Sequence, residues 1–206
     1  IKSVVDLVAY VASIVNTTTS AGGADEESDD DYRERIHEAP ERFSTAGPTG
    51  AYEYWTKSAN SGIIDVAVTS PSAGAVEIRP LMTGGTLPEQ ELLDAVKTVV
   101  SADKVRPLTD NVSVVAPDAV SYDITLTYYT DVGTAESTVK DAVTTAVNNY
   151  RLWQKSKIGR DINPSRLIAD VMAVAGVKRV IVTAPTYTEL TGVQVAQDKT
   201  VSVVLG

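Results

Sequence analysis

Two hydrophobic periodicities alternate along the chain and divide most of it into strands and helices. β-Branched runs at 63–69 and 75–81 flank the turn sequence SPSAG, a pattern typical of a β-hairpin. Over 88–102 the apolar residues recur at spacings of three and four, which predicts an amphipathic helix. A third strand is predicted at 112–115. Strand, strand, helix and strand are expected to form a compact α+β unit with the helix on one sheet face.

A second unit of the same style is predicted downstream. The run 122–129 alternates apolar and polar residues, which indicates a strand with one solvated face. Thr134 is expected to cap the helix that follows, because Ser, Thr, Asn and Asp are preferred at that position. Its apolar stripe consists of Ala135, Val139, Ala142, Val143, Ala146, Val147 and Tyr150. A basic connector over 151–160 is predicted to lead to the next helix.

The last third of the chain predicts one more helix and three strands. Asn163 and Pro164 have the residue types of an N-cap and of a first helical position. The apolar stripe of this helix is expected to consist of Leu167, Ile168, Val171, Met172 and Val174, with Gly176 ending the helix. A strand is predicted at 177–183, and the runs 193–196 and 201–204 are predicted to pair as a closing hairpin.

The first sixty residues are less regular. Residues 1–15 carry apolar positions at helical spacing, and 16–23 are a polar, small-residue linker. An acidic block then precedes a helix predicted over 29–43, since acidic side chains favour a helix N-terminus. The inward face of this helix is expected to comprise Tyr32, Ile36, Ala39 and Phe43, and Pro40 is expected to end or kink it. Three helix-breaking residues follow: Gly47, Pro48 and Gly50.

These elements predict an α+β fold of two or more small α/β-sandwich modules in series. Each module is expected to have a mainly antiparallel sheet with helices packed on one face. The predicted division is the tail of an upstream domain or a linker at 1–21, a helical segment and connector at 22–60, and α+β domains at 61–117 and 118–206. The chain begins at Ile1 rather than Met, so it is expected to be a fragment or a processed chain.

Composition narrows the function classes. The 206 residues are 43% hydrophobic, and 18 Lys and Arg stand against 27 Asp and Glu, a net charge of −9 that argues against a nucleic-acid partner. Without cysteine the chain has no disulfide, thiolate metal site or cysteine nucleophile, and its one histidine disfavours a histidine metal centre or a catalytic triad. No apolar run approaches the roughly 20 residues of a membrane-spanning helix.

Three features could carry chemistry, and each has a simpler structural interpretation. Asp25, Glu27 and Asp29 match alternate positions of a calcium loop, but its glycine and final glutamate are absent, which favours a solvated helix cap. His37 has glutamates nearby but no nucleophile in a recognisable setting. The glycine pair at 84–85 precedes a helix without a phosphate-loop motif, which favours a flexible connection. The sequence therefore predicts a non-enzymatic protein.

Two clusters are candidate contact sites for a protein partner. The aromatic cluster of Tyr52, Tyr54 and Trp55 either packs under the first sheet or anchors an interface. The cationic connector gathers four cations around one tryptophan: Arg151, Trp153, Lys155, Lys157 and Arg160. It is either a solvated link between helices or a contact patch for an acidic partner.

Several stretches, taken in order, resemble the baseplate J-like proteins of contractile phage tails. The segment GGADEESDDDYRER at 22–35 resembles an acidic run before a helix with Arg-x-Arg, and 50–68 is similar to the next block, with its aromatic pair and an Asp-Val step. The string RPLTDNV at 106–112, followed by Val114 and Ala116-Pro117, is the most specific part. The C-terminal half resembles the family more loosely.

The resemblance implies a wedge component of a baseplate in a phage, a bacteriocin or a related injection machine. Such a protein is expected to contact other wedge and hub proteins, to form a homo-oligomer or ring, and to rearrange so that sheath contraction begins. It is expected in the virion baseplate or tail-like particle, assembled in the host bacterial cytoplasm. The family brings no cofactor, metal or catalytic residue, and no nucleic-acid or membrane partner.

Two further expectations accompany this interpretation. Serial modules joined by polar linkers are expected to keep their cores while shifting relative to one another. The alternative function is a receptor- or glycan-binding module of a tail structure, which predicts a monomer with measurable ligand affinity and no ring assembly.

Overall fold

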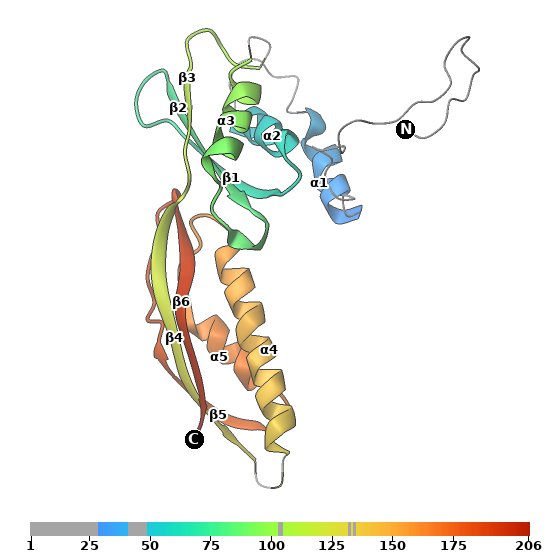
Figure 1. Cartoon of the computed structure of the whole chain (residues 1–206), viewed down its shortest axis with the longest axis vertical. Coiled ribbons are helices and arrows are strands. Elements are labelled where there is room, and N and C mark those ends of the chain that lie inside the picture. The colour runs from blue at the N-terminus through green and yellow to red at the C-terminus, as the bar shows by residue number, and fades with distance from the viewer. Residues whose placement is uncertain (1–28, 41–48, 103–104, 132, 134) are drawn as a thin grey trace, which may run out of the picture.

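The computed structural model describes residues 29–40, 49–102, 105–131, 133 and 135–206. Its elements form two α+β modules in series, each built on a three-stranded mixed sheet (Figure 1), which confirms the predicted fold class. The helix and linker predicted at 1–15 and 16–23 lie outside the described residues. In the part of the chain that is described, no helix is both long and apolar enough to cross a bilayer.

The first module packs two helices against its sheet. Its elements are α2 (Thr49–Ala59), β1 (Ile63–Thr69), β2 (Ala75–Met82), the 3₁₀ turn η2 (Thr83–Gly85), α3 (Gln90–Val100) and β3 (Asn111–Val114). Strand β2 is central, antiparallel to β1 as the predicted hairpin requires and parallel to β3. Leu93, Val96 and Val100 of α3 are buried at spacings of three and four, which confirms the helix predicted there.

The second module has the same layering. Its elements are β4 (Asp118–Thr130), α4 (Glu136–Lys155), α5 (Pro164–Met172), β5 (Val177–Ala184) and β6 (Gln194–Leu205). Strand β4 is central, antiparallel to β5 and parallel to β6. Every second side chain of β4 from Tyr122 to Tyr128 is buried against the helices, so the predicted strand with one solvated face is confirmed. Each sheet thus has one antiparallel and one parallel pair, rather than mainly antiparallel pairing.

The predicted closing hairpin is wrong, because 194–205 form one continuous strand. Strand β6 runs parallel to β4 along its whole length. Between Tyr122 and Ile124 the partner strand advances from Asp198 to Val201, so β6 carries one extra residue there. This bulge accommodates the polar residues that resemble a turn in the sequence. The Thr200 amide donates to the Asp123 carboxylate at 3.0 Å and stabilises it.

The boundaries of α2 and α4 differ from the prediction. The aromatic cluster belongs to a regular helix, α2, where a broken chain is predicted, because Gly50 lies in its first turn and does not interrupt it. Helix α4 begins after an Ala135 N-cap that makes no side-chain hydrogen bond, and it continues to Lys155. The first half of the predicted connector is therefore helical. Thr134, the expected cap, lies outside the described residues.

Helix α5 begins as predicted and ends earlier. The Asn163 side chain accepts a hydrogen bond from the Ser165 amide, with Pro164 in the first turn. The helix ends at Met172, and Gly176 lies in the following turn at φ 88°. Only part of the expected stripe is buried: Leu167 and Val171 face the core, whereas Ile168 and Met172 are exposed.

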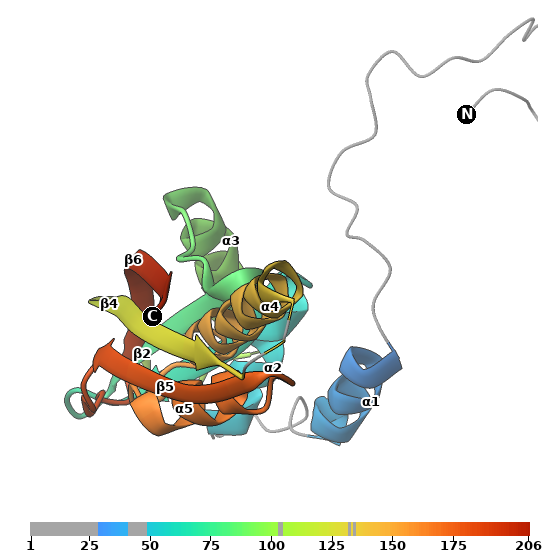
Figure 2. The same ribbon diagram turned by 90° about the horizontal axis from the view of Figure 1, so that it is seen from below.

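The prediction that helix α1 (Asp29–Glu38) buries its apolar face is wrong. Tyr32 and Ile36, expected on its inward face, are 49% and 54% exposed. The helix lies to one side of the two modules (Figure 2), and the Arg35 guanidinium covers the Tyr32 ring at 5.1 Å. An α-helix ends at Glu38, before Pro40 as predicted, and Phe43 lies outside the described residues.

Buried tyrosines make the second module sensitive to alkaline pH. The Tyr122 and Tyr150 hydroxyls are buried and have no hydrogen-bond partner among the described residues. Burial raises the pKa of Tyr150 to about 12, with a smaller effect of Asp170, and burial also raises the pKa of Tyr122. Because the folded-state pKa exceeds the ordinary 10.0, this contribution to stability is complete below pH 10.0 and is lost as pH rises toward about 12.

We therefore expect the free energy of unfolding to fall steeply above pH 10.0. Urea unfolding followed by circular dichroism at a series of pH values measures the fall. Tyr150→Phe removes one of these groups, so its stability should decline less steeply over the same interval. Equal slopes for the two proteins would contradict the assignment.

Candidate functional site: the joint between the modules

The predicted contact residues lie at two separate places. Tyr52, Tyr54 and Trp55 belong to α2 in the first module, whereas Arg151, Trp153, Lys155, Lys157 and Arg160 lie at the end of α4 and in the loop after it. The end of α4 meets the turn that follows β2 of the first module (Figure 1). The cationic connector is therefore part of the joint between the two modules.

The aromatic cluster packs largely inside the first module. Tyr52 is buried in the core, and its hydroxyl donates to the Asp110 carboxylate at 2.8 Å. Tyr54 is also buried, with its ring edge-on to Trp55 at 5.4 Å between centroids. These two tyrosines match the packing alternative. Trp55 is only partly buried, and its role as an interface anchor stays a prediction.

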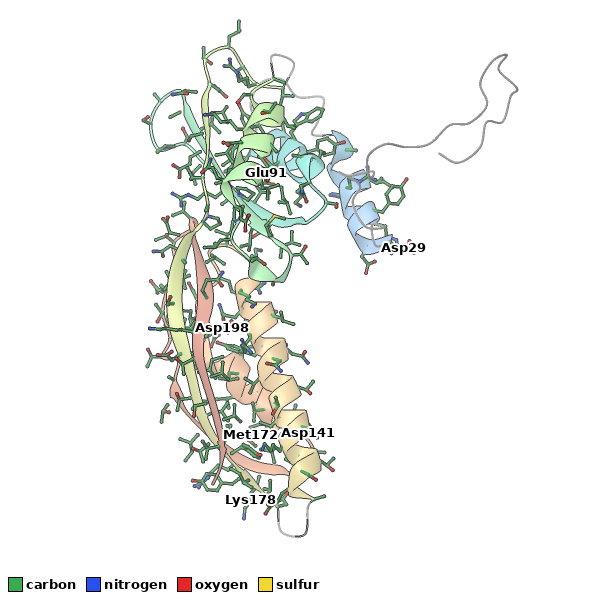
Figure 3. All side chains as sticks on the ribbon, viewed as in Figure 1. Asp29, Glu91, Asp141, Met172, Lys178 and Asp198 are labelled. Carbon is green, nitrogen blue, oxygen red and sulfur yellow. The ribbon has the colours of Figure 1, made fainter. Side chains whose placement is uncertain are left out.

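Two of the connector cations hold α4 against β6. The Arg151 guanidinium donates to Asp198 Oδ2 at 2.6 and 2.8 Å, and Lys155 Nζ lies 3.7 Å from Asp198 Oδ1. The Asp198 side chain is only 7% exposed and lies beside α4 (Figure 3). A carboxylate this buried needs charged partners, so these cations stabilise the module itself.

Arg160 and Trp153 of the connector stack on each other. The Arg160 guanidinium covers the Trp153 ring at 4.2 Å, and it donates to the Trp153 carbonyl and to Ser156 Oγ. Burial lowers the pKa of Arg160, and the negative charge of Asp65 partly opposes this effect. Lys157 is exposed. A partner contact by these residues stays a prediction, but Arg160 already has a structural role.

A small apolar core lies across the joint. Leu81 of β2 packs with Ile158 of the loop after α4 and with Val195 of β6, and all three are buried. Ala67 and Leu87 of the first module pack against this group. The joint therefore has a hydrophobic core of its own, drawn from both modules.

Polar contacts surround this core. Asp65 of β1 accepts a hydrogen bond from the Ile158 amide at 2.8 Å, and the Gln197 amide of β6 donates to the Gly85 carbonyl at 2.7 Å. Asp65 directly follows a register shift in β1, and Asp198 directly precedes the bulge in β6. Irregularities of this kind re-aim side chains, and here both carboxylates are directed to the end of α4.

The connection between the modules is short and apolar. The predicted polar linker is absent, since only the residues Val-Ala-Pro at 115–117 separate β3 from β4. The Arg79 guanidinium donates to the Ala116 carbonyl at 3.0 Å and to Asp118 at 2.8 Å. Burial alone would lower the pKa of Arg79, but hydrogen bonds to Asp118 and Glu77 outweigh it and raise the pKa.

Gly85 is the functional residue that sequence reasoning missed. The pair at 84–85 is expected to be a flexible connection, yet Gly85 is buried against the last turn of α4. A Cβ on Gly85 would lie 2.4 Å from the Lys155 carbonyl oxygen, and its φ of 72° is also unfavourable for other residues. The adjacent glycines were the available signal, because they permit a close backbone approach.

The described residues offer no metal-binding cluster of three or more His, Asp or Glu side chains. Apolar packing, hydrogen bonds and the Arg79–Asp118 ion pair connect one module to the other at the joint.

Two family models match the chain in tandem. Residues 44–116 match the Baseplate J-like central domain, and 122–204 match the Baseplate J-like protein C-terminal domain. Baseplate protein J of Escherichia phage P2 is 36% identical over 156 residues, 75% of this chain and 51% of that protein. The chain thus spans about half the length of this curated relative.

A solved structure shares the fold. The cryo-EM structure of the anti-feeding prophage baseplate, 6-fold symmetrised, contains a chain that aligns with a TM-score of 0.57 at 14% identity. The alignment covers 81% of this chain and 41% of the other.

Proposed function

Because this chain belongs to the Baseplate J-like family, we propose that it is a wedge component of the baseplate in a contractile phage tail or tail-like particle. The observation that carries the proposal is the tandem order of the two family matches, one on each module. Baseplate protein J of phage P2 supports the assignment to a phage baseplate. The relative from phage P2 is named as a baseplate protein, and we propose that this chain likewise has a structural role and is not an enzyme.

In this role the chain contacts other wedge and hub proteins and contributes to a ring around the hub, whose rearrangement starts sheath contraction. Its elongated form suits this role, because two modules in series present separate surfaces to different neighbours (Figure 1). The joint is occupied by contacts within the chain, so partner contacts belong on the remaining surface, including the exposed part of Trp55.

Electron microscopy of particles from a strain lacking this gene tests the proposal, with a strain complemented by the intact gene as the control. The expected result is tails or sheaths without a proper baseplate, with normal particles restored on complementation. Normal contractile particles in the deletion strain would contradict the wedge assignment and favour a receptor- or glycan-binding module.

Trp55→Ala is expected to weaken baseplate assembly without unfolding the chain. Its ring is partly exposed on α2, and large aromatic side chains dominate the energetics of many interfaces. The measurement is the fraction of complete particles in the complemented strain, together with circular dichroism of the purified variant. Ser58→Ala on the same helix serves as the control and should assemble normally. An unfolded Trp55→Ala protein would instead assign this residue to the core.

A further inference from the structure

A closed circuit of contacts connects three elements at the joint. Gly85 of η2 packs on the backbone of Lys155 at the end of α4. The Lys155 ammonium lies 3.7 Å from Asp198 of β6, and the neighbouring Gln197 amide donates back to the Gly85 carbonyl. Each element thus contacts both of the others. No element can shift relative to its neighbours without breaking at least one of these contacts.

Two further restraints act at other points of the joint. The Asp65 carboxylate of β1 holds the Ile158 amide beyond the end of α4, and the Ile158 side chain fills the shared apolar core. Arg79 fixes the short connection by binding both the Ala116 carbonyl and Asp118. Restraints at separate points oppose both bending and twisting. Modules of one chain are expected to move relative to one another unless their interface restrains them, and here the restraint combines a shared apolar core with polar contacts at several points.

We infer that the joint locks the two modules into one rigid unit and that Gly85 sets their separation. Only a residue without a Cβ permits η2 to approach α4 this closely. A side chain at position 85 would separate η2 from α4 and break the Gln197 hydrogen bond. The rigidity does not depend on the proposed function. A role in transmitting movement between baseplate partners as one rigid body rests on that function.

Spin-label distance measurements on the whole 206-residue chain test this inference. The chain has no native cysteine, so introduced cysteines are labelled selectively. Glu91→Cys on α3 and Asp141→Cys on α4 place exposed labels on different modules, at residues marked in Figure 3. Asp141→Cys with Lys178→Cys places both labels in the second module. Pulsed electron paramagnetic resonance then gives a distance distribution for each pair.

The expected result is a cross-module distribution as narrow as the distribution within the second module. A cross-module distribution about twice as wide, at unchanged width for the other pair, would overturn the inference. Because the measurement uses isolated protein, it is independent of particle assembly. Normal contractile particles in the deletion strain would therefore refute the proposed function and leave the rigidity intact.

A matched pair of glycine variants tests the role of Gly85. Gly84 and Gly85 have nearly equal φ angles of 73° and 72°, so alanine strains the backbone similarly at both positions. A Cβ on Gly84 meets no atom closer than 3.9 Å, whereas on Gly85 it collides with α4. Gly85→Ala should broaden or shift the cross-module distribution, and Gly84→Ala should not. Equal behaviour of both variants would overturn the assignment of Gly85.

A second matched pair keeps the test decisive if Gly85→Ala fails to fold. Gln197→Ala removes only the side chain that binds the Gly85 carbonyl. Gln194→Ala, on the same strand, removes a side chain that bonds the Thr191 amide within its own module. Broadening of the cross-module distribution is expected for Gln197→Ala alone. Unchanged distributions in both variants would show that this contact does not lock the joint.

Discussion

Asparagine in place of Asp198 is expected to lower the free energy of unfolding by about 2–3 kcal/mol. The carboxylate is 7% exposed and receives both Arg151 and Lys155, whose side chains are 33% and 21% exposed. Removing it leaves two partly buried cations without their counter-charge. Partial solvation of the cations keeps the loss below that of a fully buried pair. Urea denaturation followed by circular dichroism measures the change.

Asp118→Asn is the matched control for this substitution. Asp118 also pairs with an arginine, Arg79, at 2.8 Å, but its own side chain is 58% exposed. An exposed ion pair contributes about 0.2–1 kcal/mol, so the control should lose much less stability than D198N. A loss of similar size in the two variants would contradict a special role for burial at Asp198. A smaller loss of stability in Asp198→Asn than in Asp118→Asn would also contradict a special role for burial at Asp198.

Local periodicity correctly predicts the helices and strands that bury a single row of apolar side chains against one core. Helix α3 and strand β4 follow their sequence patterns, because their apolar residues face a single core. The Asn163 cap was also predictable, since its hydrogen bond spans only two residues. Long-range pairing was not. The stretch of β6 that resembles a turn in the sequence is a bulge. It is recognised as a bulge only from the pairing of β6 with β4, for example of Asp198 with Tyr122, which lie 76 positions apart.

At helix α2 the local sequence predicts a broken chain where the structure has a regular helix. Glycine near its start disfavours a helix in isolation, but the packing of Tyr52 against the first core overrides this preference. At α1 the apolar stripe was predicted to be buried, yet Tyr32 and Ile36 remain exposed on the chain itself. Periodicity identifies the face that is apolar, and it does not identify the surface against which that face packs.

The candidate site was predictable only in part. The sequence places cations near Trp153, and charge density alone cannot distinguish a free surface from a joint. Their partner Asp198 lies 47 residues from Arg151, and Asp65 lies 93 residues from Ile158. Contacts over such separations arise from the fold. Arg151 and Lys155, predicted to contact an outside partner, therefore also stabilise the chain internally, and Gly85, predicted to be flexible, is buried against α4.

Leu81→Ala is expected to lower the free energy of unfolding by about 3 kcal/mol and to uncouple the two modules. Leu81 is fully buried in the small core that both modules share. Its truncation leaves a cavity between Ile158 and Val195 and weakens the contact that makes the modules unfold together. In the unaltered chain, a single unfolding transition is expected.

The two tryptophans allow each module to be followed separately. Trp55 reports on the first module and Trp153 on the second. Trp153→Phe therefore keeps only the reporter of the first module, and Trp55→Phe keeps only that of the second. Both reporters should give the same denaturant midpoint in the parent chain and different midpoints when Leu81→Ala is added.

Ile78→Ala provides the matched control for this uncoupling. Ile78 lies on β2 with Leu81 and is equally buried, but it packs in the core of the first module. Its truncation should cost a similar amount, about 2–5 kcal/mol, while the two reporters continue to unfold together, because the joint core is intact. Coincident midpoints in Leu81→Ala would contradict the coupling role of the joint. Separated midpoints in Ile78→Ala would show that any loss of stability uncouples the modules, in which case Leu81 has no special position.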